Sequence, residues 1–126
     1  MAAEFNALKY IQFIPYNGKQ VFFVDYSECK DKWEMIKLLE ASADFYRRSD
    51  TKLLSLSDFH NIKGSSEFMD TAKRLNKEVL DENTEKGAVL GVTGLKKVLL
   101  QGYNMVAKQK LMPFDTKEEA LKYLAG

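Results

Sequence analysis

Strand-type and helix-type patterns alternate along most of this 126-residue chain, and the alternation limits the folds open to it. Short runs rich in Val, Leu and Phe are each followed by a longer segment with apolar residues at helical spacing. Strand–helix–strand connections are almost always right-handed, so repeated units give a mainly parallel sheet covered by helices. The pattern therefore predicts an α/β domain.

The chain opens with a different signal, a predicted β-hairpin. Strand-like runs over residues 8–16 and 19–26 flank the dipeptide Asn17-Gly18. Asn-Gly adopts the positive φ angles of a type I′ turn, which joins two antiparallel strands. The second run is continuously apolar over residues 21–24, as expected for a central strand covered on both faces.

The whole chain predicts the order ββαβαβαβα, a small mixed sheet of about five strands packed by about four helices. Asp31 with Glu34, and Thr116 with Glu119, have the spacing of capping boxes at helix N-termini. Among the residues that helical spacing turns inward are Trp33, Leu95, Val98 and Val106. The predicted segments after the hairpin are helices over 31–48, 65–82, 95–106 and 116–124, and strands over 52–59, 88–92 and 110–114.

The bulk composition indicates one globular domain, residues 1–126, and argues against several classes of protein. Basic (19) and acidic (18) side chains nearly balance at a net charge of +1, which leaves no general excess for binding nucleic acid. The single cysteine, Cys29, excludes an internal disulfide and a multi-cysteine zinc site, and it fits a reducing compartment. No apolar run reaches the roughly 20 residues of a membrane span, and residues 1–10 lack a secretion-signal pattern. We expect a cytoplasmic protein without metal or cofactor.

The turn before the third predicted helix invites comparison with phosphate-binding loops. A Walker loop places Lys and then Ser or Thr directly after its last Gly, whereas Gly94 is followed by Leu95. We interpret this turn as a tight strand-to-helix connection with Thr93 as the helix N-cap. The alternative is an anion or ligand site at the helix N-terminus, formed by Thr93, Gly94, Lys96 and Lys97.

Two carboxylates offer the strongest candidate for catalysis. Asp25 and Asp58 both close predicted strands, and carboxylates at neighbouring strand ends can bind magnesium or accept a phosphoryl group. Aspartate at a strand end also commonly makes a local Asx turn. The only histidine, His60, has no companion ligands at metal-binding spacing, and no G-x-S-x-G nucleophile elbow is present. A turn role for His60 is the favoured interpretation.

Two serines open the second predicted helix. Serine is a good N-cap, so Ser65 and Ser66 are expected to help start this helix. The functional alternative is phosphorylation, because a phosphate at this position gains from the helix N-terminus and alters a docking surface.

Four segments, VFFVDYS, LLSLSDF, AVLGVTGLKKVLL and LMPFDTKEEALKYL, together resemble the SpoIIAA-like group of the STAS superfamily, and bacterial members in particular. The resemblance extends over essentially the whole chain after the hairpin, and it implies a small mixed sheet packed by helices. Regulatory members of that family are anti-sigma-factor antagonists, switched by phosphorylation of a serine in a D-S-S-G-L-type motif. That motif falls on residues 64–68, where Gly64 replaces the acidic residue and Glu67 replaces the glycine.

The leading functional expectation is a non-enzymatic protein-interaction module, with self-association through the aromatic hairpin as an additional expectation. The alternative is binding of a small molecule, anion or lipid at the strand-to-helix edge. A third hypothesis is a metal-dependent phosphatase that uses Asp25 and Asp58. Lipid-binding folds related to this family enclose an apolar ligand under an additional lid helix, and this sequence shows no segment for one.

Overall fold

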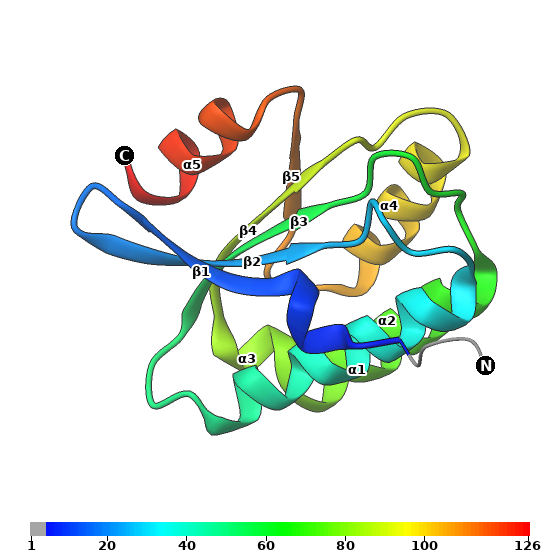
Figure 1. The fold of residues 1–126 in the computed structure, drawn as a ribbon, viewed down its shortest axis with the longest axis horizontal. Helices are drawn as coiled ribbons and strands as arrows, with labels where there is room; N and C mark the ends of the chain where they lie inside the picture. The colour runs from blue at the N-terminus through cyan, green and yellow to red at the C-terminus, as the bar shows by residue number, and fades with distance from the viewer. Residues whose placement is uncertain (1–4) are drawn as a thin grey trace.

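A five-stranded sheet runs through the molecule with its strands in chain order, β1-β2-β3-β4-β5 (Figure 1). The computed structural model describes residues 5–126. Residues 1–4, part of the segment predicted to lack a secretion signal, lie outside the described residues. Strand β1 is antiparallel to β2, and the remaining neighbours pair in parallel. The strands are β1 (Ile11–Tyr16), β2 (Lys19–Asp25), β3 (Leu53–Asp58), β4 (Thr84–Leu90) and β5 (Leu111–Phe114). The predicted mixed, mainly parallel sheet is confirmed.

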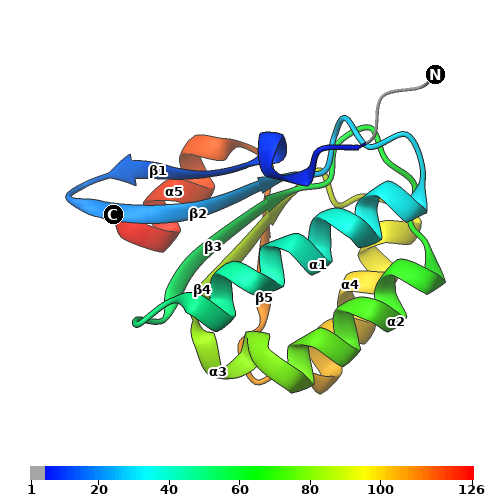
Figure 2. The same ribbon diagram turned by 60° about the horizontal axis from the view of Figure 1, so that its bottom comes forward.

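Helices cover the two faces of the sheet unequally (Figure 2). Each connection between parallel strands moves the sheet one strand further in the same direction, so right-handed crossovers place their helices on the same face. The last helix leads to no further strand and lies on the opposite face. The crossover helices are α1 (Lys32–Arg48), α2 (Ser66–Leu75) and α4 (Leu95–Val106), and the last helix is α5 (Lys117–Ala125). Shorter turns are η1 (Ala7–Tyr10), the π-helical η2 (Asn76–Leu80) and α3 (Asp81–Asn83).

The core has two layers, one on each side of the sheet. Strand β2 contributes to both, since Phe22 packs with the residues of α1 and α2 whereas Val21 and Phe23 pack with those of α5. All four residues 21–24 are buried, which confirms the prediction of a central strand. Ala120 and Ala125 let α5 lie close to the sheet, while the other layer is filled by larger side chains.

Local signals in the sequence fix several element ends. Asn17 (φ 50°) and Gly18 (φ 76°) both have the positive φ angles of the predicted hairpin turn. The Asp31 side chain accepts a hydrogen bond from the Glu34 backbone N–H at 2.9 Å, as an N-cap does. Thr116 caps α5 in the same way, by accepting a hydrogen bond from the backbone N–H three residues later.

The predicted inward face of α4 is wrong, and so is one predicted inward position of α1. On α4, Leu95 is 64% exposed, Val98 61% and Val106 61%, and the helix instead buries Leu100 and Tyr103. Apolar residues surround α4 on more than one side, so its sequence pattern does not determine which side faces the sheet. Trp33 of α1 is also exposed. Element limits also differ from the prediction: residues 8–10 lie in η1 rather than in β1, and β4 extends over Thr84–Leu90 rather than over residues 88–92.

Candidate functional site: an apolar cavity under three helices

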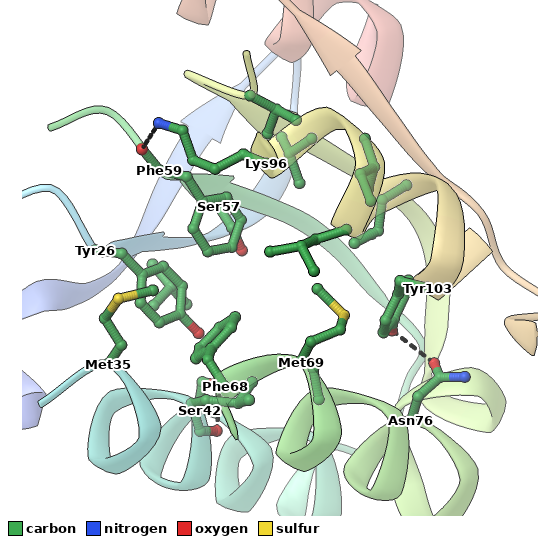
Figure 3. Close-up of a pocket in the computed structure, with 18 of the residues that line it drawn as sticks. Tyr26, Met35, Ser42, Ser57, Phe59, Phe68, Met69, Asn76, Lys96 and Tyr103 are labelled. Atoms are coloured by element: carbon green, nitrogen blue, oxygen red, sulfur yellow. Dashed lines mark hydrogen bonds between the residues drawn. The ribbon is translucent and has the colours of Figure 1, made fainter. Parts of the chain in front are cut away.

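A cavity of about 110 Å³ lies between the sheet and helices α1, α2 and α4 (Figure 3). Its walls are mainly apolar, with Met35 and Leu39 contributed by α1, Phe68 by α2 and Leu100 by α4. The helices α1 and α4 both pack against α2, so the three together form a roof over the sheet. The cavity is the space that this roof and the large side chains beneath it leave unfilled.

Several polar side chains in the cavity wall are paired within the protein. The Tyr103 hydroxyl donates to Asn76 Oδ1 at 2.7 Å, and the Ser42 hydroxyl donates to the Leu39 carbonyl oxygen at 2.7 Å. Over residues 5–126, every fully buried side-chain nitrogen and oxygen has a hydrogen-bond partner. A polar ligand would have to replace such bonds, whereas an apolar ligand requires none. The lining therefore favours an apolar ligand.

Three tyrosines bring phenol groups to the cavity. Burial raises the pKa of Tyr46 to about 12, with hydrogen bonds to Ser55 and Thr84 acting in the opposite direction. Burial also raises the pKa of Tyr26 and of Tyr103. All three phenols consequently stay neutral near pH 7, so they bring no charge into the cavity.

The cavity reaches the surface between α2, α4 and the loop that joins β3 to α2. The lining residues Ile62, Met69 and Leu99 are only partly buried, and Lys63 is exposed. Gly64 in the loop lies against Leu99 of α4, because a Cβ at Gly64 would be only 2.7 Å from Leu99 Cδ1. Loop and helix therefore meet closely at one side of this opening.

The predicted serine site lies at the rim of the same cavity. Ser65 is the N-cap of α2, and its hydroxyl oxygen accepts a hydrogen bond from the Phe68 backbone N–H at 3.2 Å. Its hydroxyl also donates to Glu67 Oε2 at 3.0 Å. Ser66 is the first residue of α2 and is exposed. The capping role is confirmed for Ser65, while phosphorylation of either serine stays a prediction.

The turn before α4 differs from its predicted geometry. Gly94, at φ 58° and ψ −131°, occupies the N-cap position without any side-chain cap, so the prediction that Thr93 caps this helix is wrong. The Lys96 ammonium donates to the Phe59 carbonyl oxygen at 2.9 Å and ties α4 to the loop after β3. Lys97 is exposed. An anion site at this helix start stays a prediction, with Lys96 already bonded to the protein.

The two strand-end carboxylates lie side by side, since Asp25 and Asp58 are register partners in β2 and β3. Asp25 Oδ1 accepts hydrogen bonds from the Ser27 backbone N–H at 2.9 Å and hydroxyl at 2.6 Å. Asp58 Oδ1 lies 2.9 Å from the His60 backbone nitrogen, which donates to it, and 2.6 Å from His60 Nδ1. Both carboxylates therefore make the local turns that were the alternative to a metal site.

Other candidate reactive groups lack the environment that catalysis uses. Burial, followed by the nearby Glu34, Asp25 and Asp31 carboxylates, raises the pKa of Cys29 to about 12, so this thiol is protonated at neutral pH. Within the described part of the chain, no group of three or more His, Cys, Asp or Glu side chains is placed to hold a metal ion.

The sequence did not reveal the cavity-lining tyrosines as a group. Tyr26 lies in the loop after β2, Tyr46 in α1 and Tyr103 in α4, and none of them was predicted as a site residue. No spacing rule connects them, because they meet only after the helices have packed on the sheet.

Comparison with known proteins supports the fold. No protein-family model matches the sequence, and no curated protein matches it significantly. Among solved structures, the chain is similar to an uncharacterised protein of the DUF3478 family with a SpoIIAA-like fold from Shewanella loihica PV-4. The two share 16% sequence identity and a TM-score of 0.63, over 90% of this chain and 91% of that one.

The protein is thus an α/β domain with a SpoIIAA-like fold, as the sequence resemblance implied. At this level of sequence identity the likeness establishes the fold and not an activity. Across residues 5–126, no helix combines the length and the apolar character needed to cross a bilayer.

Proposed function

We propose that this chain is a non-enzymatic binding module that holds a small apolar molecule, or the end of an acyl chain, under α1, α2 and α4. The observation that carries the proposal is the mainly apolar cavity of about 110 Å³, in whose wall Tyr103, Asn76 and Ser42 are already hydrogen-bonded within the protein. Cavities of about 150 Å³ lined by Leu, Ile and Phe stay dry and take up benzene. A ligand of similar size and polarity suits this site.

Titration with benzene, and separately with hexanol, tests this proposal. The backbone amide signals of cavity-lining residues are expected to shift in nitrogen-15 NMR spectra, with Phe68 and Leu100 among them, and the melting temperature is expected to rise with ligand concentration. The Ala72→Leu substitution fills part of the cavity, since Ala72 is buried in its wall. It is expected to abolish both responses.

A matched control adds the same atoms elsewhere. Ala41→Leu changes the partly buried side of α1 outside the cavity lining and is expected to preserve the response to benzene. Shifts that are absent, or that persist unchanged in folded Ala72→Leu protein, would contradict binding in the cavity.

The second candidate function is a regulatory protein-interaction module that is switched at Ser65 or Ser66. The observation that favours it is the exposure of Ser66 at the first position of α2, where a phosphate gains from the helix dipole. Glu67 already carries negative charge there, because hydrogen bonds from its backbone N–H, Lys32 and Ser65 lower its pKa. A phosphate at Ser66 would therefore add to an anionic, partner-accessible helix end.

Mass spectrometry after incubation with ATP and a lysate of the native host tests this switch. Phosphate is expected on Ser66 rather than Ser65, since the Ser65 hydroxyl is engaged in capping. Ser66→Asp is expected to change which proteins the chain retains, and Ser66→Ala serves as its control. The switch is ruled out when neither serine is modified and both variants retain the same proteins.

A further inference from the structure

Helix α4 exposes a row of apolar side chains beside the cavity opening. Leu95, Val98, Met105 and Val106 are 64%, 61%, 85% and 61% exposed, and we call these four residues the α4 face. Helical spacing places them along one side of α4, next to Leu99 of the cavity wall. Leu95 and Val98 lie near the start of the helix and Met105 and Val106 at its end, with Gly102 between the two pairs. Isolated exposed apolar residues are ordinary, whereas a group on one side of a helix indicates an interaction surface.

The same region has an unbalanced charge. Residues 91–114 contain four lysines and no Asp or Glu, so this segment carries +4 while the whole chain carries +1 and the remainder therefore −3. Within residues 5–126, none of these lysines forms an ion pair. The segment's basic residues are Lys96, Lys97, Lys108 and Lys110.

Further lysines border the α4 face from the neighbouring elements. Lys63 is exposed in the loop at the cavity opening, and Lys73 of α2 reaches toward α4 at Gly102. The Asp81 carboxylate accepts hydrogen bonds from the backbone N–H groups of Lys108 and Gln109 just after α4. Lysines from α2, α4 and the neighbouring loops therefore border the apolar side chains of the α4 face.

We propose that the α4 face docks on an anionic lipid surface. Apolar side chains of an interfacial helix insert at the boundary between headgroups and acyl chains, and lysines around them attract anionic headgroups. A second copy of this chain is disfavoured as the occupant, because a symmetric contact through α4 would bring the lysines of both copies together. Docking would also place the cavity opening at the lipid surface, so an apolar ligand would enter without crossing water.

Sedimentation with lipid vesicles tests the docking. The wild-type chain is expected to sediment with phosphatidylcholine vesicles that contain about 30% phosphatidylserine, and to remain in solution with phosphatidylcholine alone. High salt is expected to release it, because screening weakens the attraction of exposed lysines.

Paired variants separate the two contributions. Lys97→Ala with Lys108→Ala is expected to lower vesicle partitioning about tenfold or more. Its control, Lys37→Ala with Lys52→Ala, removes two exposed lysines from other faces and is expected to change partitioning little.

A second double variant and its control test the apolar contribution to vesicle binding. Val98→Ser with Met105→Ser is expected to lower partitioning about tenfold, whereas Leu8→Ser with Trp33→Ser removes similarly exposed apolar groups elsewhere and is expected to preserve it. All these side chains are exposed, so the variants are expected to fold, and unchanged melting temperatures verify this.

Three results would overturn the proposal. They are failure of the wild-type chain to sediment with anionic vesicles, equal losses in the α4 and control variants, and self-association in solution that only the α4 variants abolish. The last result would identify the α4 face as a contact between copies of the chain. Benzene binding and its loss in Ala72→Leu are measured without lipid, so cavity binding and membrane docking can fail independently.

Discussion

Replacing Gly91 by alanine is expected to lower the free energy of unfolding by about 3 kcal/mol or more, among the larger effects of single substitutions. Gly91 follows β4 with a φ of 71°, where a side chain is unfavourable. A Cβ there would also lie 2.5 Å from the His60 backbone nitrogen and 2.8 Å from His60 Cα. Since these are backbone atoms, only movement of the chain relieves the clash. Urea denaturation followed by circular dichroism measures the change.

The control for Gly91 is alanine at Gly18 in the hairpin turn. Gly18 has a similar φ of 76°, but nothing lies within 4 Å of a Cβ built there. Gly18→Ala is therefore expected to show only the conformational cost, about 1 kcal/mol. Equal losses in the two variants would show that the approach of Gly91 to His60 contributes nothing to stability.

The contact at Gly91 matters because it joins the two loops beside the candidate site. The Phe59 backbone N–H donates to the Leu90 carbonyl oxygen at 2.9 Å, and Lys96 donates to the Phe59 carbonyl oxygen at the same distance. These bonds hold the β3–α2 loop against the β4–α4 turn. Phe59 and Ile62 of that loop line the cavity, so the close approach at Gly91 helps shape the opening.

The sheet was predictable because its signals are local. The Asn17-Gly18 turn fixes the hairpin through backbone conformation alone, and the apolar run at 21–24 marks a strand buried on both faces. Three strand–helix units follow the hairpin, and because their crossovers are right-handed, few arrangements of the strands are possible. The N-caps at Asp31 and Thr116 were also predictable, since a capping side chain bonds within its own turn.

The orientation of α4 on the sheet was not predictable from its sequence. Both Leu95 and Leu100 are apolar, yet the first is exposed and the second buried. Their roles depend on how α4 rests on its neighbours α2 and the sheet, which no spacing within the helix records. A helix with apolar residues on two sides buries one side in the core, and the other side stays available for a partner.

The cavity could not be predicted from the sequence for a related reason. Its volume is the difference between the space under α1, α2 and α4 and the side chains that fill it, and neither quantity is local. Ser65 and Lys96, which were named from the sequence, do lie at the cavity rim, and both are hydrogen-bonded within the fold. Over residues 5–126 the cavity forms without an additional lid helix, because the crossover helices α1, α2 and α4 themselves cover it.

Stability is expected to fall steeply between pH 10 and pH 12 because the buried tyrosines resist ionisation. An ordinary phenol in the unfolded chain ionises near pH 10, whereas burial raises the pKa of Tyr46 in the folded protein to about 12. Between these values the unfolded state binds fewer protons than the folded state, so the free energy of unfolding decreases as pH rises. Below pH 10 both states hold the proton and the contribution of Tyr46 is fully present.

The Tyr46→Phe variant isolates this contribution. A pKa difference of two units at one buried phenol corresponds to about 2–3 kcal/mol of the free energy of unfolding. The wild type loses this stability by pH 12, whereas the variant does not. Removing the hydroxyl also weakens the variant at neutral pH, since the hydrogen bonds to Ser55 and Thr84 are lost. The informative quantity in urea titrations at successive pH values is therefore the slope of stability against pH, expected to be shallower in Tyr46→Phe.

A neighbouring substitution supplies the control for that slope. The Phe22 ring lies 5.3 Å from the Tyr46 ring, so Phe22→Leu weakens the same packing without removing a titratable group. Its stability is expected to be lower at every pH and to fall with the wild-type slope. If stability falls with the same slope in Tyr46→Phe and in the wild type, the Tyr46 phenol ionises equally easily in the folded and the unfolded protein. The cavity wall at Tyr46 would then be accessible to water, which would contradict an apolar ligand in the cavity.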